Sequence, residues 1–314
     1  MNHTKKLPLP VLLVLDFIIG CLILCAFAYF HHIRPQELQS NSTIISKPTD
    51  QVEAPWKEKF AEHFTDTVIK TENSYTSPNV SIKITTHRNE KNTATYYIAD
   101  IYVSSIECIG SWFADGVYGS NITETGMKMY QNSGAILAMN GDYYGARKTG
   151  LVIRNGEIYR SETITNQDSC VLYYDGTVKT FIGTQINLAD LIKDGAYQAW
   201  SFGPSLLDKN GNALREYPSW YSKISDANPR SAFGYYEPGH YCFVSIDGRS
   251  DDSEGMSFTE MSELFESLGC KAAYNLDGGM SSFMVFNNKY VNNLAWGGRE
   301  ISDSIIIKDP FVKE

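Results

Sequence analysis

Two strand-forming runs in the last third of the chain each end in Asp-Gly. The run 241–246 is followed by Asp247 and, two residues later, Arg249; the run 271–276 is followed by Asp277 and two glycines. Carboxylates act as bases or nucleophiles in hydrolysis, and a guanidinium binds phosphate or carboxylate in a bidentate manner. These residue types together indicate a site for an anion that undergoes acid–base chemistry.

Two further polar motifs follow or precede strand-like runs. The apolar run 135–139 ends in Asn140, Gly141 and Asp142, and Arg230 stands directly after a proline at the start of the run 232–236. Asn, Gly and Asp are also common in ordinary tight turns, and an arginine is common at a surface. A functional and a structural interpretation therefore both stay open for these motifs.

The segment after Asp277 combines glycines with hydroxyl groups. Gly278 and Gly279 allow a ligand to approach the backbone, and successive amides in such a turn can bind anionic oxygens. Ser281 and Ser282 add hydroxyl groups that can donate to a ligand. No histidine lies in any of these motifs, so the sequence gives little support for a nucleophilic serine.

A helix is predicted between the two Asp-Gly turns. Ser257 and Glu260 have the spacing of a capping box, apolar residues follow at helical spacing, and Gly269 is a stop signal. A strand, a helix and a strand within about thirty residues predict a βαβ crossover with parallel strands. Their carboxyl ends would open on one edge, so we expect the carboxylates of Asp247 and Asp277 within about 10 Å of each other.

The rest of the chain has short β-forming runs and few helices. Asn155-Gly156 and Asp175-Gly176 each separate two such runs, which is a strong hairpin signal. We predict an α+β or α/β fold with a mixed β-sheet, several hairpins and one βαβ crossover. The other predicted strands cover residues 81–86, 95–103, 135–139, 150–154, 170–174 and 178–182.

The N-terminal region predicts a membrane anchor. Residues 9–30 are almost wholly apolar and follow lysines on a short tail, 1–8, which we expect in the cytoplasm. Residues 31–75 predict a stalk with a short amphipathic helix over 56–69, and residues 76–314 a single domain. A cleaved signal peptide is the alternative. The expected location is the cell membrane, single-pass, with the domain extracytoplasmic.

Composition excludes several functions. The formal net charge of −9 argues against nonspecific nucleic-acid binding, and no phosphate-loop or dinucleotide motif indicates a nucleotide. The cysteines lack the C-x-x-C spacing of zinc sites. Cys242 and Cys270 fall near the starts of the two predicted parallel strands, where buried free thiols are favoured and an oxidised pair is geometrically compatible.

These motifs, in this order, resemble the phosphodiester glycosidase family, whose bacterial members are associated with exopolysaccharides. The resemblance covers residues 81–307 and departs at Met280, where the family usually carries a third glycine or another small residue. The matching motifs are Ala138-Met139-Asn140-Gly141-Asp142-Tyr143-Tyr144, Gly150-Leu151-Val152-Ile153 with Asn155-Gly156, Phe202-Gly203-Pro204, Asn228-Pro229-Arg230-Ser231-Ala232-Phe233-Gly234, Asp247-Gly248-Arg249, Asn275-Leu276-Asp277-Gly278-Gly279 with Ser281-Ser282, and Gly298-Arg299 with Ser302-Asp303.

The resemblance implies hydrolysis of a sugar-1-phosphodiester between the anomeric carbon and the phosphate oxygen. It implies catalytic roles for Asp142, Asp247 and Asp277. The implied substrate-binding residues are Asn140, Tyr143, Arg230, Arg249, Asn275, Gly278, Gly279, Ser281 and Ser282. Since phosphate is a good leaving group, electrostatic stabilisation should matter more than strong acid assistance.

Two alternatives remain open at this point. The first is a noncatalytic, membrane-anchored module that binds phosphorylated glycans. The second is a calcium-dependent hydrolase or binding domain, because the motifs are rich in Asp and Asn oxygens. The sequence requires no cofactor, and a divalent cation such as calcium is compatible with it. The expected partners are a phosphorylated glycan and, through the N-terminal helix, a membrane.

Overall fold

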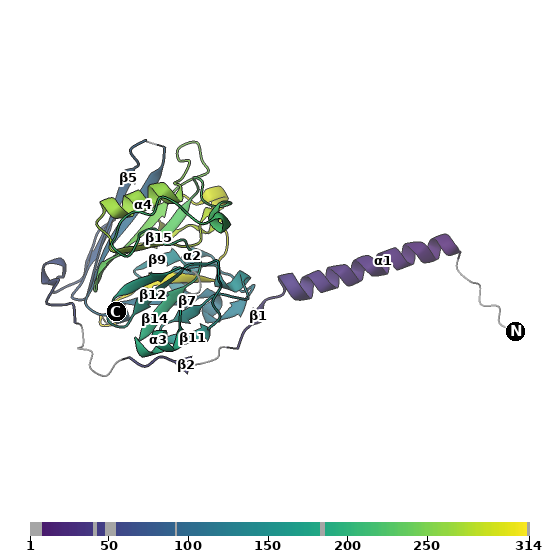
Figure 1. Cartoon of the computed structure of the whole chain (residues 1–314), viewed down its shortest axis with the longest axis horizontal. Helices are drawn as coiled ribbons and strands as arrows, with labels where there is room; N and C mark the ends of the chain where they lie inside the picture. The colour runs from purple at the N-terminus through teal and green to yellow at the C-terminus, as the bar shows by residue number, and fades with distance from the viewer. Residues whose placement is uncertain (1–7, 40–42, 48–54, 92, 183–185, 313–314) are drawn as a thin grey trace.

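The computed structural model describes residues 8–39, 43–47, 55–91, 93–182 and 186–312. It contains a β-rich domain from which one long helix, α1 (Leu9–Ala28), extends outward (Figure 1). Within those ranges, α1 is the helix that is long and apolar enough to cross a membrane. A signal sequence passes the same test, so the helix fits secretion as well as anchoring. The predicted tail, 1–8, lies outside the described residues except for Pro8.

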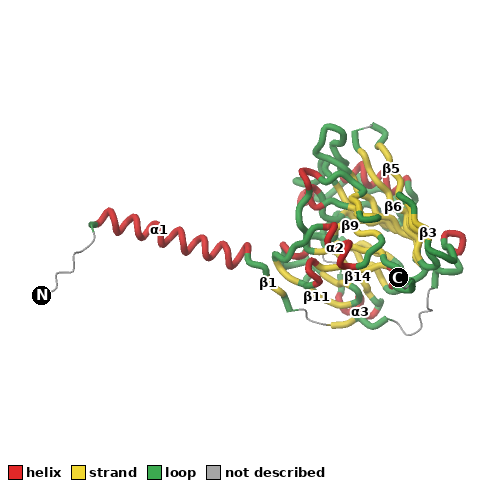
Figure 2. The backbone as a smooth tube through the Cα atoms, turned by 180° about the vertical axis from the view of Figure 1, so that it is seen from behind, coloured by secondary structure: helices red, strands yellow, loops and turns green. Residues whose placement is uncertain are grey.

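Three sheets form the domain, and a two-stranded ribbon joins them to the N-terminal segment (Figure 2). The largest sheet has the order β17 (Ala272–Asn275), β15 (Arg230–Glu237), β16 (His240–Ile246), β6 (Thr95–Val103), β5 (Val80–Arg88), β4 (Ser74–Thr76) and β3 (Ile69–Lys70). The second has the order β13 (Val178–Phe181), β12 (Ser169–Tyr173), β14 (Ala196–Trp200), β10 (Val152–Arg154), β11 (Glu157–Arg160) and β2 (Thr43–Ile44).

The third sheet has the order β19 (Lys289–Tyr290), β18 (Met284–Phe286), β9 (Leu137–Asn140), β20 (Asp303–Ile307) and β7 (Ile109–Phe113). The ribbon pairs β1 (Gln36–Glu37) with β8 (Gly119–Ser120). The remaining α-helices are α2 (Gly126–Ser133), α3 (Leu188–Lys193) and α4 (Phe258–Ser267). Short 3-10 helices cover Ala61–His63, Ile106–Cys108, Ala114–Gly116, Tyr144–Ala146, Ser219–Tyr221, Gly279–Ser281 and Ala295–Gly297.

The three sheets contribute one face each to a shared hydrophobic core, because strands alternate their side chains between two faces. On β16, Tyr241 and Phe243 enter this core, whereas Cys242 and Val244 pack with the buried residues of α4. Residues of α2 pack in the same way on the third sheet, and Leu191 of α3 on the second. The outer face of each sheet is thus covered by one short helix.

The helix predicted before Gly269 is confirmed as α4. Ser257 Oγ accepts the amide of Glu260 (3.3 Å), and the Glu260 carboxylate accepts the amide of Ser257 (3.0 Å), which completes the capping box. Gly269 ends the helix with φ +77°, a conformation that favours glycine. The predicted hairpins at Asn155-Gly156 and Asp175-Gly176 are also confirmed, joining β10 to β11 and β12 to β13.

The predicted crossover is confirmed only in part. β15 lies between β16 and β17 and pairs antiparallel with both, so β16 and β17 run in the same direction but are not neighbours. Every strand pair in the described ranges is antiparallel, so the prediction of a mixed sheet is wrong, whereas the common direction predicted for the two strands is confirmed. The tight β15–β16 hairpin explains the difference, because a short turn joins antiparallel neighbours.

The segment predicted as a stalk contacts the domain at several points. β1 pairs with β8, β2 pairs with β11, and β4 pairs with β5. Trp56 and Phe60 are buried in the shared core. In place of the amphipathic helix predicted over 56–69, the chain forms turns and the 3-10 helix Ala61–His63.

Cys242 lies in β16, and Cys270 lies between the end of α4 and the start of β17. Both are buried free thiols, and their Sγ atoms are 4.0 Å apart. They belong to the core between the large sheet and α4.

Candidate active site

The carboxyl ends of β16 and β17 meet at Pro229, the residue before β15. A Cβ atom added to Gly248 would lie 2.7 Å from Pro229 N, and one added to Gly278 would lie 2.7 Å from Pro229 O. The two Asp-Gly turns are therefore about two strand spacings, roughly 10 Å, apart. The amide of Asp277 donates to Gly141 O (3.3 Å), so the end of β9 reaches the same edge.

Asp277 is buried except for a small part of its side chain. Its side chain is 11% exposed, and Oδ2 accepts a hydrogen bond from Arg299 Nη2 at 2.8 Å. Oδ1 accepts the amide of Gly278 (2.9 Å), and Arg299 Nε donates to Ser281 Oγ (2.6 Å). Burial raises the pKa of Asp277, while the contacts with Ser281 and Arg299 oppose that rise.

Tyr143 links Arg299 to a second arginine. Its backbone has φ +67°, uncommon for a residue other than glycine, and the residue is 37% exposed. Arg299 Cζ lies 5.1 Å from the centre of the Tyr143 ring, and Arg147 Cζ lies 5.8 Å from it. We call Asp277, Arg299, Tyr143 and Arg147 the rim cluster. It presents a carboxylate and two cations along one edge.

Arg249 adds a further cation beside the glycine segment. Its Nη2 donates to Asn228 Oδ1 (2.9 Å), and its Cζ lies 5.0 Å from the ring of Trp296, which is 71% exposed. A Cβ atom on Gly279 would lie 3.2 Å from the Arg249 guanidinium. Because Gly279 has no side chain, the exposed guanidinium of Arg249 can lie close to the backbone of Gly279.

Asp247 lies at the predicted edge but is fully engaged by neighbours. Its Oδ1 accepts the amide of Asn293 (2.8 Å), and its Oδ2 accepts Asn293 Nδ2 (2.8 Å) and the Tyr97 hydroxyl (3.1 Å). Burial raises the pKa of Asp247, and these donors oppose the rise. Burial, together with the contact with Asp247, raises the pKa of Tyr97 to about 12. In this structure, Asp247 fixes the loop that leads to Trp296.

Asp142 is buried in an ion-pair network. Arg154 Nη2 lies 2.9 Å from Asp142 Oδ1 and 2.8 Å from Asp303 Oδ2, and all three side chains are 1% exposed. The amide of Ser201 donates to Asp142 Oδ2 (2.7 Å). We call Asp142, Arg154 and Asp303 the buried cluster. It joins the ends of β9, β10 and β20 beneath the candidate site.

The buried cluster holds two carboxylates against one guanidinium. Burial raises the pKa of Asp303 to about 7, with Asp142 adding to the rise and Arg154 opposing it. Asp303 Oδ1 is buried without a hydrogen-bond partner among the described residues. A protonated Asp303 gives the cluster one positive and one negative charge, which is the balanced state for a buried site.

Arg230 has different partners from those predicted. Its Nε donates to Met256 O (3.1 Å), and its Nη2 donates to Ile224 O (2.5 Å) and Asp226 O (2.6 Å). The residue is buried, and burial lowers its pKa to about 10. In this structure the guanidinium joins loop carbonyls, so a phosphate would have to displace them.

The remaining predicted residues form hydrogen bonds that hold the strand ends around Asp277 in place. Asn140 Nδ2 donates to Asp277 O (2.7 Å), and its Oδ1 accepts the amide of Phe283 (3.1 Å). Asn275 Nδ2 donates to Gly203 O (2.7 Å), and Ser282 Oγ donates to Arg230 O (2.6 Å). The backbone amides that were predicted to bind anionic oxygens already have acceptors within the chain. These are the amides of Gly278, Gly279, Ser281 and Ser282.

The order of these motifs is matched by a known family. A sequence model of the phosphodiester glycosidase family matches residues 133–308, which is more than half of the chain. The chain belongs to this family. The matched range includes the whole rim cluster and the whole buried cluster, and it confirms the resemblance found from the motifs.

Two relatives illustrate the relationship. The SPbeta prophage-derived uncharacterized protein YomE of Bacillus subtilis (strain 168) is 29% identical over 215 residues, covering 67% of this chain and 32% of YomE. The chain therefore spans about a third of that relative. The catalytic domain of zebrafish N-acetylglucosamine-1-phosphodiester alpha-N-acetylglucosaminidase is 16% identical, with a TM-score of 0.59 and coverage of 87% and 89%. This likeness shows a shared fold.

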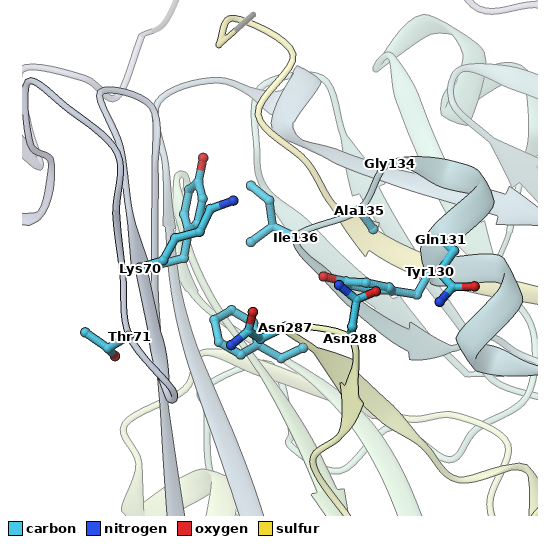
Figure 3. Close-up of a pocket in the computed structure, with 11 residues that line it drawn as sticks. Lys70, Thr71, Tyr130, Gln131, Gly134, Ala135, Ile136, Asn287 and Asn288 are labelled. Carbon is cyan, nitrogen blue, oxygen red and sulfur yellow. The ribbon is translucent and has the colours of Figure 1, made fainter. Parts of the chain in front are cut away.

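A separate cavity of about 310 Å³ lies at the other end of β9 (Figure 3). Lys70, Tyr130, Asn287 and Asn288 line it, and its lining includes no carboxylate. Glycosidases commonly act through carboxylates, so this cavity lacks the groups that hydrolysis in a phosphodiester glycosidase needs. In the part of the chain that the structure describes, no three His, Cys, Asp or Glu side chains form a potential metal-binding group.

The sequence motifs contained signals for some residues that the predicted site omitted. Arg299 and Asp303 belong to family motifs, but the motifs alone did not show that Arg299 would face Asp277. Arg154 follows three apolar residues in a strand, and a charge in a buried strand indicates a paired partner. No sequence signal pointed to Arg147, whose guanidinium lies near the ring of Tyr143, four residues earlier in the chain.

Proposed function

We propose that the chain is an extracytoplasmic hydrolase that cleaves a sugar-1-phosphodiester of a cell-envelope or exopolysaccharide glycan. The observation that carries this proposal is the carboxylate of Asp277, which lies at the strand edge in a side chain that is 11% exposed. It is held by Arg299 beside a further cation, Arg249, in a chain of the phosphodiester glycosidase family. A carboxylate flanked by cations suits an anionic diester that loses its sugar to water.

Asp277 acts as the base or nucleophile in this proposal. Its raised pKa favours proton uptake from an attacking water, and Arg299 keeps the carboxylate oriented. Arg249 and Arg147 bind the phosphate oxygens, because both guanidinium groups lie beside the rim without a carboxylate partner in the described contacts. The phosphomonoester leaves with its negative charge neutralised, so a strong general acid is not needed.

Asp142 and Asp247 take supporting roles in the proposal. Asp142 fixes the end of β9 through Arg154, and Asp247 fixes the loop that carries Trp296. Tyr143 contributes its exposed ring to the substrate surface. Asn140, Asn275, Ser281 and Ser282 hold the backbone of the edge in place, as does Arg230 through its carbonyl contacts.

The proposed location is supported by α1. In the proposal, α1 spans the membrane once, Lys5 and Lys6 stay on the cytoplasmic side, and the domain from about residue 76 onward lies outside. Cleavage after the helix would release the same domain outside the cell. A membrane fractionation of the full chain, followed by protease treatment of intact cells, separates these outcomes.

The test of the activity uses the full chain in detergent and a panel of sugar-1-phosphodiesters. N-acetylglucosamine is the first sugar to include, because the zebrafish relative is named for a diester of that sugar. We expect equal amounts of free sugar and phosphomonoester, and no release by Asp277→Asn. Binding of a panel member without release by the wild-type chain would instead identify a noncatalytic binding module.

A further inference from the structure

The connection between α1 and the domain is short. α1 ends at Ala28, and β1 begins at Gln36 and pairs with β8. Even fully extended, the chain between those two residues spans at most about 30 Å. Asn121 Nδ2 also donates to Arg34 O (3.4 Å), so the connector is fastened to the domain at the β8 end. The face that carries β8 is therefore the face nearest to the membrane when α1 is inserted.

The rim cluster adjoins that face. The side chain of Ser120 in β8 donates to Gly145 O (3.1 Å), two residues after Tyr143. Pro35 of the connector and Glu300, the neighbour of Arg299, line one hollow of about 370 Å³. The loops that carry the candidate site are thus packed on the segment that ties the domain to the membrane.

A hollow with a mainly apolar lining, to which Asn166 and Gln167 also contribute, lies at the Arg147 end of the rim cluster. It has a volume of about 260 Å³ and is lined by Arg147, Ile164, Phe202, Trp220, Tyr221 and Ile224, among others. Trp220 is 44% exposed and Ile224 is 37% exposed. Arg147 Cζ lies 4.9 Å from the Phe202 ring, so a single cation separates the hollow from Tyr143.

We propose that the substrate is a glycosyl phosphodiester of a membrane lipid, with the first part of the hydrocarbon chain in this hollow. The inference rests on the proposed function and specifies its substrate. Water adds to the anomeric carbon, the bond from that carbon to the phosphate oxygen breaks, and the products are a free sugar and a lipid phosphomonoester. No oxidant or further reactant is needed.

Three observations favour a lipid as the occupant. The hollow offers aromatic and aliphatic surface next to a cation, which matches a hydrocarbon chain that begins at a phosphate. Exposed tryptophan is typical of protein surfaces at the level of lipid headgroups. The short connector keeps the hollow and the rim cluster near the membrane, where such a diester is presented.

The test compares two aglycones on the same sugar. The full chain is reconstituted in lipid discs and given the sugar that the panel identifies, linked through phosphate either to farnesol or to methanol. We expect kcat/KM to be at least about tenfold higher for the farnesyl diester, which is the effect of burying one large apolar group. Trp220→Ala and Ile224→Ala should reduce this preference, Trp220→Ala by about tenfold.

Ile192→Ala is the matched control. Ile192 lies in α3 and is 38% exposed, close to the exposure of Ile224, but it does not line the hollow. It should leave the farnesyl preference unchanged. Equal cleavage of both diesters, or the same loss of preference in the control, would overturn the lipid inference and leave the hydrolase standing. Failure to cleave any diester in the panel would overturn the proposed function itself.

Discussion

Two arginine–aspartate pairs make the same contact in opposite surroundings. Arg154 and Asp142 in the buried cluster meet at 2.9 Å with both side chains 1% exposed. Arg299 and Asp277 in the rim cluster meet at 2.8 Å with side chains 41% and 11% exposed. Since both pairs lie in the matched range of the family, motif membership does not separate them.

The surroundings of the two arginine–aspartate pairs distinguish one pair from the other. Asp142 is enclosed by Arg154 and the amide of Ser201, and Arg154 also bonds Asp303, so this network has no side open to a substrate. A buried charge must be neutralised within the protein, which suits a structural joint between strands. Asp277 keeps part of its surface open, so its charge is available to a bound molecule. In the proposed function, solvent access, more than residue type, distinguishes the carboxylate of Asp277 from that of Asp142.

The largest expected effect on stability is that of Arg154→Met. This change leaves two buried carboxylates without their cation and should lower the free energy of unfolding by about 3–5 kcal/mol. Denaturant unfolding measures it. Arg249→Met removes an exposed cation and serves as the control, with a small change in stability expected. Equal losses in the two variants would show that the buried cluster is not a structural joint.

The next effect concerns activity at the rim. Arg299→Met removes a charge-assisted hydrogen bond to Asp277 and should lower kcat/KM by about tenfold to a hundredfold, since such a bond contributes about 1.5–3 kcal/mol. The melting temperature should fall by less than in Arg154→Met, because Arg299 is 41% exposed. Steady-state kinetics on a cleaved diester, with thermal melting in parallel, measure both.

Arg230→Lys should show the reverse pattern. It loses the planar group that joins three loop carbonyls, so it should lower the melting temperature more than it lowers substrate affinity. A variant that melts normally but binds the diester weakly would return Arg230 to a direct role in binding phosphate.

A further effect is a pH dependence that belongs to the buried cluster. The folded-state pKa of Asp303, about 7, lies above its ordinary value of 3.8. The stabilising contribution of protonated Asp303 is therefore complete below about pH 4 and is lost as the pH rises through about 7. Asp303→Asn mimics the protonated form and should have a flatter profile of melting temperature from pH 4 to 8. Parallel profiles for the variant and the wild type would contradict this.

Local signals in the sequence were sufficient for the elements around the site. The capping box at Ser257 and Glu260 predicted α4, and Asn155-Gly156 predicted a hairpin, because both depend on hydrogen bonds and backbone angles of nearby residues. The common edge for Asp247 and Asp277 followed from strand direction. β15 was not placed between their strands, since strand pairing depends on partners far apart in the chain.

The roles of the charged residues depended on such distant contacts. The motif of Arg230 did not reveal the loop carbonyls that surround it, and the motif of Asp142 did not reveal Arg154. Arg299 meets Asp277 only after the chain returns along the third sheet. Composition and spacing predicted which residue types gather at the edge, whereas burial and pairing decide which of them face a substrate.

The most direct test compares Asp277→Asn with Asp142→Asn in the full chain. Turnover of a cleaved sugar-1-phosphodiester and the melting temperature are measured for both variants. We predict that Asp277→Asn lowers turnover by orders of magnitude at a nearly unchanged melting temperature, since it removes a charge that the transition state requires. Asp142→Asn should lower the melting temperature, because it unbalances the buried cluster. Near-normal turnover in Asp277→Asn, with turnover lost in an Asp142→Asn variant that melts normally, would contradict the account.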